Sequence, residues 1–142
     1  MEQRISLITL GVTDLARSRH FYEQGLGWHP SSASNEHVTF FQTGGMILAL
    51  YGKKALAQDA HLSHEGTGFG GIALAYNVRQ REEVDVVLAE VQAAGATILK
   101  PAEETDWGGY AGYFADLDGY PWEVAWNPHF PLLDDGRVQL LQ

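Results

Sequence analysis

The feature that most constrains the fold of this chain is an order of elements that occurs twice. In the first half, a β-branched run at Ile5–Val12 is followed by Asp14, a good N-cap, and by apolar residues at helical spacing. Three short strand-like segments follow, at Trp28–Ser32, His37–Gln42 and Met46–Tyr51. The first half therefore predicts a βαβββ module.

The second half repeats this order. A strand is expected at Gly71–Val78, and then a helix with apolar residues at i, i+3, i+4 and i+7 that Gly95 closes. Further strands are expected at Thr97–Lys100, Tyr110–Asp116 and Pro121–Trp126. We assign the modules to about residues 4–52 and 70–128, within one domain of 142 residues that ends in a tail at 129–142. The connector at about 53–69 is long for an unstructured loop, which indicates a short helix or a lid.

Two such modules predict an α+β fold. One helix cannot cover both faces of a sheet, so we expect a curved, mixed, eight-stranded sheet with helices on its convex face and a concave cavity. Alternation along the last strand places Trp122 and Val124 on one face and Glu123 on the other. We expect the aromatic face to pack against a helix and Glu123 to face the cavity.

Composition excludes several classes of function. The chain has 18 acidic and 9 basic residues, a net charge of −9, and its Lys and Arg are scattered, which argues against nucleic-acid binding. It has no cysteine, so disulfides and thiol chemistry are excluded. No apolar run approaches the roughly 18 residues of a membrane span. We expect a cytoplasmic protein without a membrane partner.

Two motifs carry a family resemblance. The stretch at 9–28 reads TLGVTDLARSRHFYEQGLGW, and the stretch at 112–126 reads GYFADLDGYPWEVAW. Both resemble the opening and closing signatures of the vicinal oxygen chelate superfamily, which includes glyoxalases, bleomycin-resistance proteins and extradiol dioxygenases. Leu117 stands where proline is usual in the closing turn. The resemblance covers about residues 4–128 and implies the fold more strongly than any reaction.

The resemblance also implies where a metal would bind. Metalloenzymes of this superfamily hold a divalent ion with four side chains, and the matching positions here are Leu7, Ala49, Gly71 and Glu123. Only Glu123 has a side chain that binds a metal, whereas such sites need several oxygen or nitrogen ligands. We therefore expect no metal cofactor. The alternative is a metal site rebuilt from histidines, for which His37 at the start of a strand is the main candidate and His61 and His64 in the connector are weaker ones.

Small residues at the former ligand positions, with aromatic residues near them, describe an apolar pocket with one acid. The expected ligand-binding residues are Leu7, Ala49, Tyr51, Gly71, Trp107 and Tyr113. Glu123 is the candidate general base or ligand anchor. The simpler interpretation is that side chains fill the cavity and that Glu123 only hydrogen-bonds across the sheet.

Two functional classes follow. In the first, the protein is metal-free and binds a small organic ligand, as the resemblance to bleomycin-resistance proteins implies. In the second, it is a lyase, isomerase or dioxygenase of this superfamily, with a rebuilt metal site or with Glu123 as a base. Small members of the superfamily commonly pair, so we expect a homodimer in either class.

Overall fold

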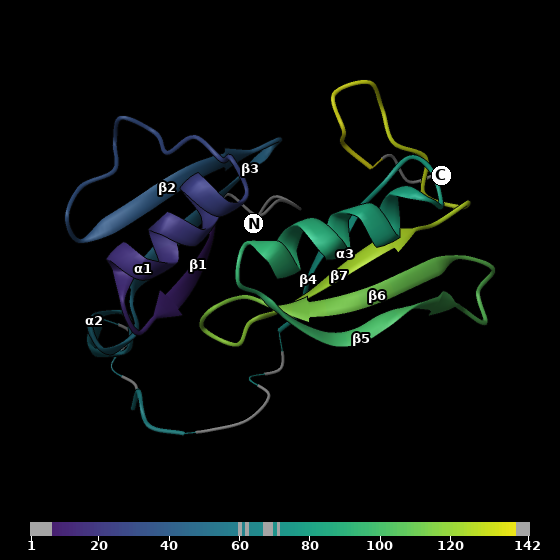
Figure 1. The fold of residues 1–142 in the computed structure, drawn as a ribbon. Helices are drawn as coiled ribbons and strands as arrows, with labels where there is room; N and C mark the ends of the chain where they lie inside the picture. The colour runs from purple at the N-terminus through teal and green to yellow at the C-terminus, as the bar shows by residue number, and fades with distance from the viewer. Residues whose placement is uncertain (1–6, 60, 62, 67–69, 71, 139–142) are drawn as a thin grey trace. The chain divides into compact units, whose positions relative to one another are not determined.

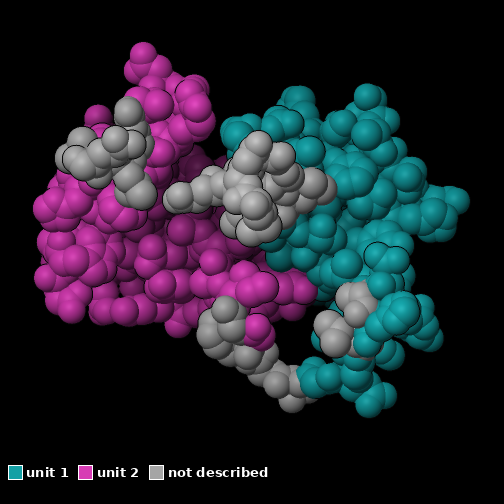
Figure 2. Space-filling view, turned by 180° about the vertical axis from the view of Figure 1, so that it is seen from behind, with its two compact units in different colours: residues 1–68 teal, residues 69–142 magenta. Residues whose placement is uncertain are grey.

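The repeated order of elements folds into two units, residues 1–68 and 69–142, each with its own open, mixed sheet (Figure 1; Figure 2). The computed structural model describes residues 7–59, 61, 63–66, 70 and 72–138. Three α-helices and seven strands lie in these residues, which confirms the α+β class. None of the helices in the described ranges has the length and apolar character needed to cross a membrane.

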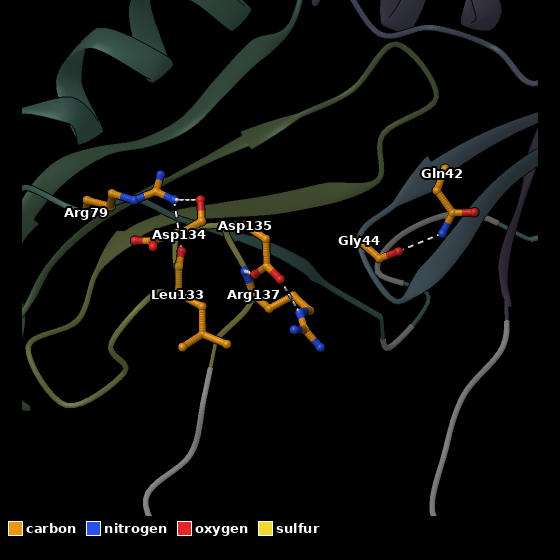
Figure 3. Close-up of polar contacts among 7 residues, drawn as sticks. All are labelled: Gln42, Gly44, Arg79, Leu133, Asp134, Asp135 and Arg137. Carbon is orange, nitrogen blue, oxygen red and sulfur yellow. Dashed lines mark hydrogen bonds and ion pairs between the residues drawn. The ribbon is translucent and has the colours of Figure 1, made fainter.

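The first unit has a three-stranded sheet in the order β1-β3-β2. Strand β1 spans Leu7–Val12, β2 spans Val38–Thr43 and β3 spans Met46–Gly52. Strands β1 and β3 are parallel, and β2 and β3 are antiparallel. The expected hairpin turn joins β2 to β3, with Gly44 at φ +68° and the amide of Gln42 donating to the Gly44 carbonyl (Figure 3).

One helical segment covers one face of this sheet. The carboxylate of Asp14 accepts from the backbone N–H of Arg17 at 3.0 Å and so caps α1, Leu15–His20, as expected. The segment continues as a π-helical turn, Phe21–Gly25. The core of the unit is formed by fully buried side chains of the covered face and of the helical turn: Leu10, Val12, Phe21, Tyr22, Phe41 and Leu50. Alternation places Phe40 and Ala49, which are partners in the β2–β3 register, on the opposite face.

The structure differs from expectation at Trp28–Ser32. This segment forms no strand, only a single bridge between Pro30 and Phe41. Pro30 has no N–H to donate, and the N–H of Phe40 is taken by the Ser34 hydroxyl at 2.9 Å. The described residues of the first unit therefore form three strands, where four were expected. Trp28 packs its ring against Tyr22 and Phe41.

The connector contains the short helix that its length indicated, α2, Lys53–Asp59. This helix lies close to β1. A Cβ atom added at Gly11 of β1 would be only 3.1 Å from the Cα of Lys53, the first residue of α2. Glycine at this position thus permits the approach of α2 to the strand.

The second unit has four strands in the order β4-β7-β6-β5. Strand β4 spans Leu74–Asn77, β5 spans Thr97–Glu104, β6 spans Tyr110–Ala115 and β7 spans Pro121–Trp126. Helix α3, Glu83–Ala93, lies across one face of the sheet and buries Val84, Leu88 and Val91 (Figure 1). Trp122 and Val124 are buried on the face that α3 covers, and Trp122 stacks on Phe114 at a centroid distance of 6.0 Å.

A small hairpin follows β7. Leu132 and Val138 form a bridge, the N–H of Leu133 donates to the Arg137 carbonyl at 2.9 Å, and Gly136 has φ +84°. Arg137 pairs with Asp135 at 2.8 Å within the turn (Figure 3). We call residues 130–138 the C-terminal hairpin.

Candidate functional site

The centre of the candidate site is a hydrogen-bonded pair on two neighbouring strands. Tyr113 on β6 and Glu123 on β7 are register partners, and the Tyr113 hydroxyl donates to the Glu123 carboxylate at 2.8 Å. This hydrogen bond, followed by burial and by the negative charge of Glu123, raises the pKa of the Tyr113 phenol above its usual value. Tyr113 thus stays protonated, and one Glu123 oxygen is occupied by an internal donor.

The pair lies on the face of the sheet that α3 leaves uncovered. The residues on either side of Glu123 in β7, Trp122 and Val124, are buried on the α3 face, so alternation turns Glu123 away from the helix. Glu123 is half-buried and lines a pocket of about 890 Å³ within the second unit. Glu123 therefore faces an open pocket, as expected from the strand pattern.

Trp107 stands beside Glu123 in this pocket. It belongs to the loop between β5 and β6, where the N–H of Gly109 donates to the Thr105 hydroxyl at 2.9 Å and Gly108 has φ +86°. The indole lies directly over Gly109, since a Cβ added there would overlap the ring. Trp107 is 39% exposed, so the loop holds a large aromatic ring at the pocket instead of burying it.

The charge around Trp107 and Glu123 is negative. Among the described residues that line the 890 Å³ pocket, Glu123 is the only acid, and no Lys or Arg is present. A second cavity of about 370 Å³ shares Trp107 and Glu123 and adds the acidic residues Glu103, Glu104 and Asp106. Lys100 is paired with Glu103 at 2.6 Å and Arg81 is paired with Glu104, so the charges of Asp106 and Glu123 make this position negative. The electrostatics at this position favour a cationic group over an anionic one.

Strand β4 lines one side of the pocket with Ala75, Tyr76 and Asn77, and another wall comes from the segment that follows β7. Asn127 and His129 follow β7, and Phe130, Leu132 and Val138 of the C-terminal hairpin line the same pocket. Sequence reasoning missed these residues and treated them as a tail. The signal was present, because Asp135-Gly136 between apolar residues is typical of a tight hairpin.

The other residues predicted for the site belong to the first unit or lie outside the description. Leu7 is the first residue of β1, Ala49 is buried in β3 opposite Phe40, and Tyr51 lies two residues further along β3, on the same face as Ala49. Gly71 and the side chain of Leu7 lie outside the described residues. Of the predicted set, the structure brings together Trp107, Tyr113 and Glu123 in one unit.

The residues at the inferred metal positions do not fit a divalent ion. Leu7 and Ala49 have no side-chain atom that can bind a metal, and glycine at position 71 has no side chain. The Glu123 carboxylate accepts a hydrogen bond from the Tyr113 phenol. Among the described residues, no group of three His, Asp or Glu side chains is arranged to hold a metal. His37 belongs to the first unit and is exposed beside Glu36, with 3.4 Å between its Nε2 and the Glu36 carboxylate.

Comparison with known proteins identifies similar chains. The family model described as the Glyoxalase/Bleomycin resistance protein/Dioxygenase superfamily matches residues 4–124. A crystal structure of a glyoxalase-related enzyme from Fulvimarina pelagi is 38% identical, with a TM-score of 0.90, over 99% of this chain and 100% of that chain. A glyoxalase/bleomycin resistance protein/dioxygenase family enzyme from Burkholderia phytofirmans PsJN is 25% identical, with a TM-score of 0.75, over 85% of this chain and 96% of that chain. A lactoylglutathione lyase from Agrobacterium tumefaciens is 20% identical, with a TM-score of 0.68 over 89% of this chain and 95% of that chain, a likeness of fold alone.

Proposed function

The chain belongs to the glyoxalase/bleomycin resistance protein/dioxygenase superfamily, and from this membership we propose that it binds a small organic cation in the pocket beside Glu123, without a metal. The observation that carries the proposal is the Tyr113–Glu123 pair at a pocket of about 890 Å³. A carboxylate accepts hydrogen bonds at both oxygens, so Glu123 keeps acceptor capacity for a ligand while Tyr113 orients it.

The walls of the pocket define the rest of the ligand. Trp107 offers an aromatic ring next to Glu123, and a cation near both gains from the carboxylate charge and from the ring face. Leu132 and Val138 offer apolar surface to the body of the ligand. An ammonium group attached to an aromatic or aliphatic body is the ligand class that this combination supports.

A second function is an enzyme of the same superfamily. The relative from Fulvimarina pelagi, described as glyoxalase-related, favours it, and His129 lines the same pocket as Glu123. In this alternative, a divalent metal is held at a rebuilt site and supports a lyase, isomerase or dioxygenase reaction. Without a metal, Glu123 would act as a general base on a substrate proton.

The binding proposal is tested with three probes of one shape and different charge: benzylamine, benzyl alcohol and benzoate. Calorimetry should show the tightest binding for benzylamine, and Glu123→Gln should weaken benzylamine about tenfold, because the charge-assisted hydrogen bond is lost. Glu90→Gln, on the exposed side of α3, makes the same charge change away from the pocket and should leave the affinity unchanged. Equal affinity for the amine and the alcohol, or no effect of Glu123→Gln, would refute the proposal.

Elemental analysis separates the two functions. Protein purified without chelator should contain well below one divalent metal per chain if the binding proposal is right. Near one metal per chain, lost in Glu123→Gln, would establish the enzyme alternative instead. We further propose that the protein acts in the cytoplasm and has no nucleic-acid partner, since its Lys and Arg are scattered along a chain with a net charge of −9.

A further inference from the structure

The C-terminal hairpin lies beyond residue 124, where the match to the family model ends, yet it lines the pocket with Leu132, Gly136 and Val138. Most of its hydrogen bonds are internal. The N–H of Leu133 donates to Arg137, that of Gly136 donates to Leu133, and Arg137 pairs with Asp135 (Figure 3). The hairpin therefore sets its own shape, while its position needs contacts from elsewhere.

Arg79 supplies the polar part of those contacts. Its Nη2 donates to the backbone carbonyls of Leu133 and Asp134, at 3.0 and 3.1 Å (Figure 3). Within the described part of the chain, these are the only hydrogen bonds that join the C-terminal hairpin to residues before Asn127. Arg79 itself is anchored close to the site, since the preceding residue, Val78, donates its N–H to Ala125 of β7 at 2.9 Å.

The hairpin has few other means of attachment. Phe130, Leu133 and Val138 are 42%, 36% and 42% exposed, so they bury only part of their apolar surface. A segment with this little burial depends strongly on individual hydrogen bonds for its position. Because Arg79 does not itself line the pocket, its effect on a ligand would be exerted through the hairpin.

We infer that the C-terminal hairpin is the wall that determines which amines the pocket accepts, and that Arg79 is the positioning residue that holds this wall in place. The inference rests on the proposed function and adds a specificity element to it. A short amine is held by Glu123 and Trp107 alone. A longer one reaches Leu132 and Val138 and gains affinity from the apolar surface that it buries.

The first arm of the test needs no ligand. Hydrogen–deuterium exchange of the free protein should show faster exchange of the Leu133 and Gly136 amides in Arg79→Ala, by about tenfold or more. Arg81→Ala is the matched control, since Arg81 pairs with Glu104 and lies over the Tyr110 ring instead of contacting the hairpin. Unchanged exchange in Arg79→Ala would overturn the positioning role.

The second arm compares benzylamine with 4-butylbenzylamine by calorimetry. In the wild type, the butyl group should improve affinity about tenfold or more, because burying each methylene group raises the binding constant roughly fourfold. Arg79→Ala and Leu132→Ala should each remove most of this gain and weaken 4-butylbenzylamine binding much more than benzylamine binding, while Leu132→Ala should keep slow exchange in the hairpin. Arg79→Lys keeps the charge but not the guanidinium geometry, and it should fall between wild type and Arg79→Ala.

The outcomes distinguish the two proposals. If benzylamine binding is absent or insensitive to Glu123→Gln, the proposed function fails, and the inferred wall fails with it. If benzylamine behaves as expected but the butyl gain is absent, or persists in both Arg79→Ala and Leu132→Ala, the hairpin is not the specificity wall and the proposed function stands.

Discussion

At the scale of single residues, the acid of the site could be predicted from the sequence, whereas its partner's role could not. Glu123 is distinguished by an alternating strand in which it is the only charged residue between Trp122 and Trp126. Tyr113 was predicted only as a ligand contact. That it donates to Glu123 depends on the β6–β7 register, which places these two residues opposite one another. A register of this kind is fixed by the length of the turn, and a change of one residue would turn Tyr113 to the other face.

The Tyr113–Glu123 hydrogen bond should make stability depend on alkaline pH. The folded state raises the pKa of Tyr113 above the ordinary value of 10.0, so the hydrogen bond contributes stability fully below about pH 10 and loses it as pH rises through the folded-state pKa. We therefore expect Tyr113→Phe to be less stable than wild type at pH 7–9, with a difference that shrinks above pH 10. Urea unfolding across this pH range measures the difference.

The control for this pH effect is the partner residue. In a Glu123→Ala background the hydrogen bond is absent, so Tyr113→Phe should lower the free energy of unfolding by a smaller amount. This loss of stability should not shrink above pH 10 in the way expected for the wild-type background. A difference between wild type and Tyr113→Phe that does not change with pH would contradict a contribution from the Tyr113–Glu123 hydrogen bond.

At the scale of elements, periodicity predicted which segments form helices and strands, and chain chemistry explains where it failed. The prediction ended the strand that starts at Thr97 before Pro101, but β5 continues to Glu104. Proline is tolerated there because β5 is the edge strand of its sheet and its pairing with β6 is irregular between Lys100 and Glu103. The opposite error occurred at Trp28–Ser32, where side-chain hydroxyl and amide groups of the following loop replaced a strand ladder.

The packing of α3 on the second sheet depends on Gly112. A Cβ at this position would stand 2.7 Å from Leu88 of α3 and 2.9 Å from backbone atoms of Lys100 and Ala102 on β5. Backbone atoms of a paired strand cannot shift without breaking the sheet, so we expect Gly112→Ala to lower the free energy of unfolding by about 1–3 kcal/mol. Chemical denaturation measures the change.

Gly45→Ala is the matched control for Gly112→Ala. Nothing lies within 4 Å of a Cβ added at Gly45, and the φ angle of Gly45 is not positive. The substitution should change stability by no more than about 0.5 kcal/mol. Similar losses in both variants would mean that the cost at Gly112 does not come from the contact with α3 and β5.

At the scale of the whole molecule, the repeated order of elements was predictable from local periodicity, whereas the contribution of the C-terminal hairpin to the pocket was not. That contribution arises from tertiary contacts that leave little trace in local periodicity. Arg79 and Leu133 are 54 residues apart in sequence, and no pattern in either segment connects them.

We propose that the protein forms a homodimer in solution. Large apolar side chains are exposed on the described surface, including Ile72 at 54%, Val86 at 65% and Leu99 at 54%, and pairing of two copies can cover such residues. Light scattering coupled to size exclusion should give twice the chain mass of 15.6 kDa. A mass of one chain across a wide concentration range would contradict the proposal.

The strand registers determine the order of substitutions by which a second acidic site would form in this chain. Phe40 and Ala49 are opposite one another across β2–β3, as Tyr113 and Glu123 are across β6–β7, so two substitutions would copy the polar pair into the first unit. The order of the two matters. The Phe40 side chain is half-buried, so Phe40→Tyr would add a hydroxyl at modest cost. Ala49 is 1% exposed, so a carboxylate introduced there first would lose its hydration with no hydrogen-bond donor opposite it. Phe40→Tyr would therefore have to precede Ala49→Glu for the polar pair to form in the first unit without an unpaired buried carboxylate.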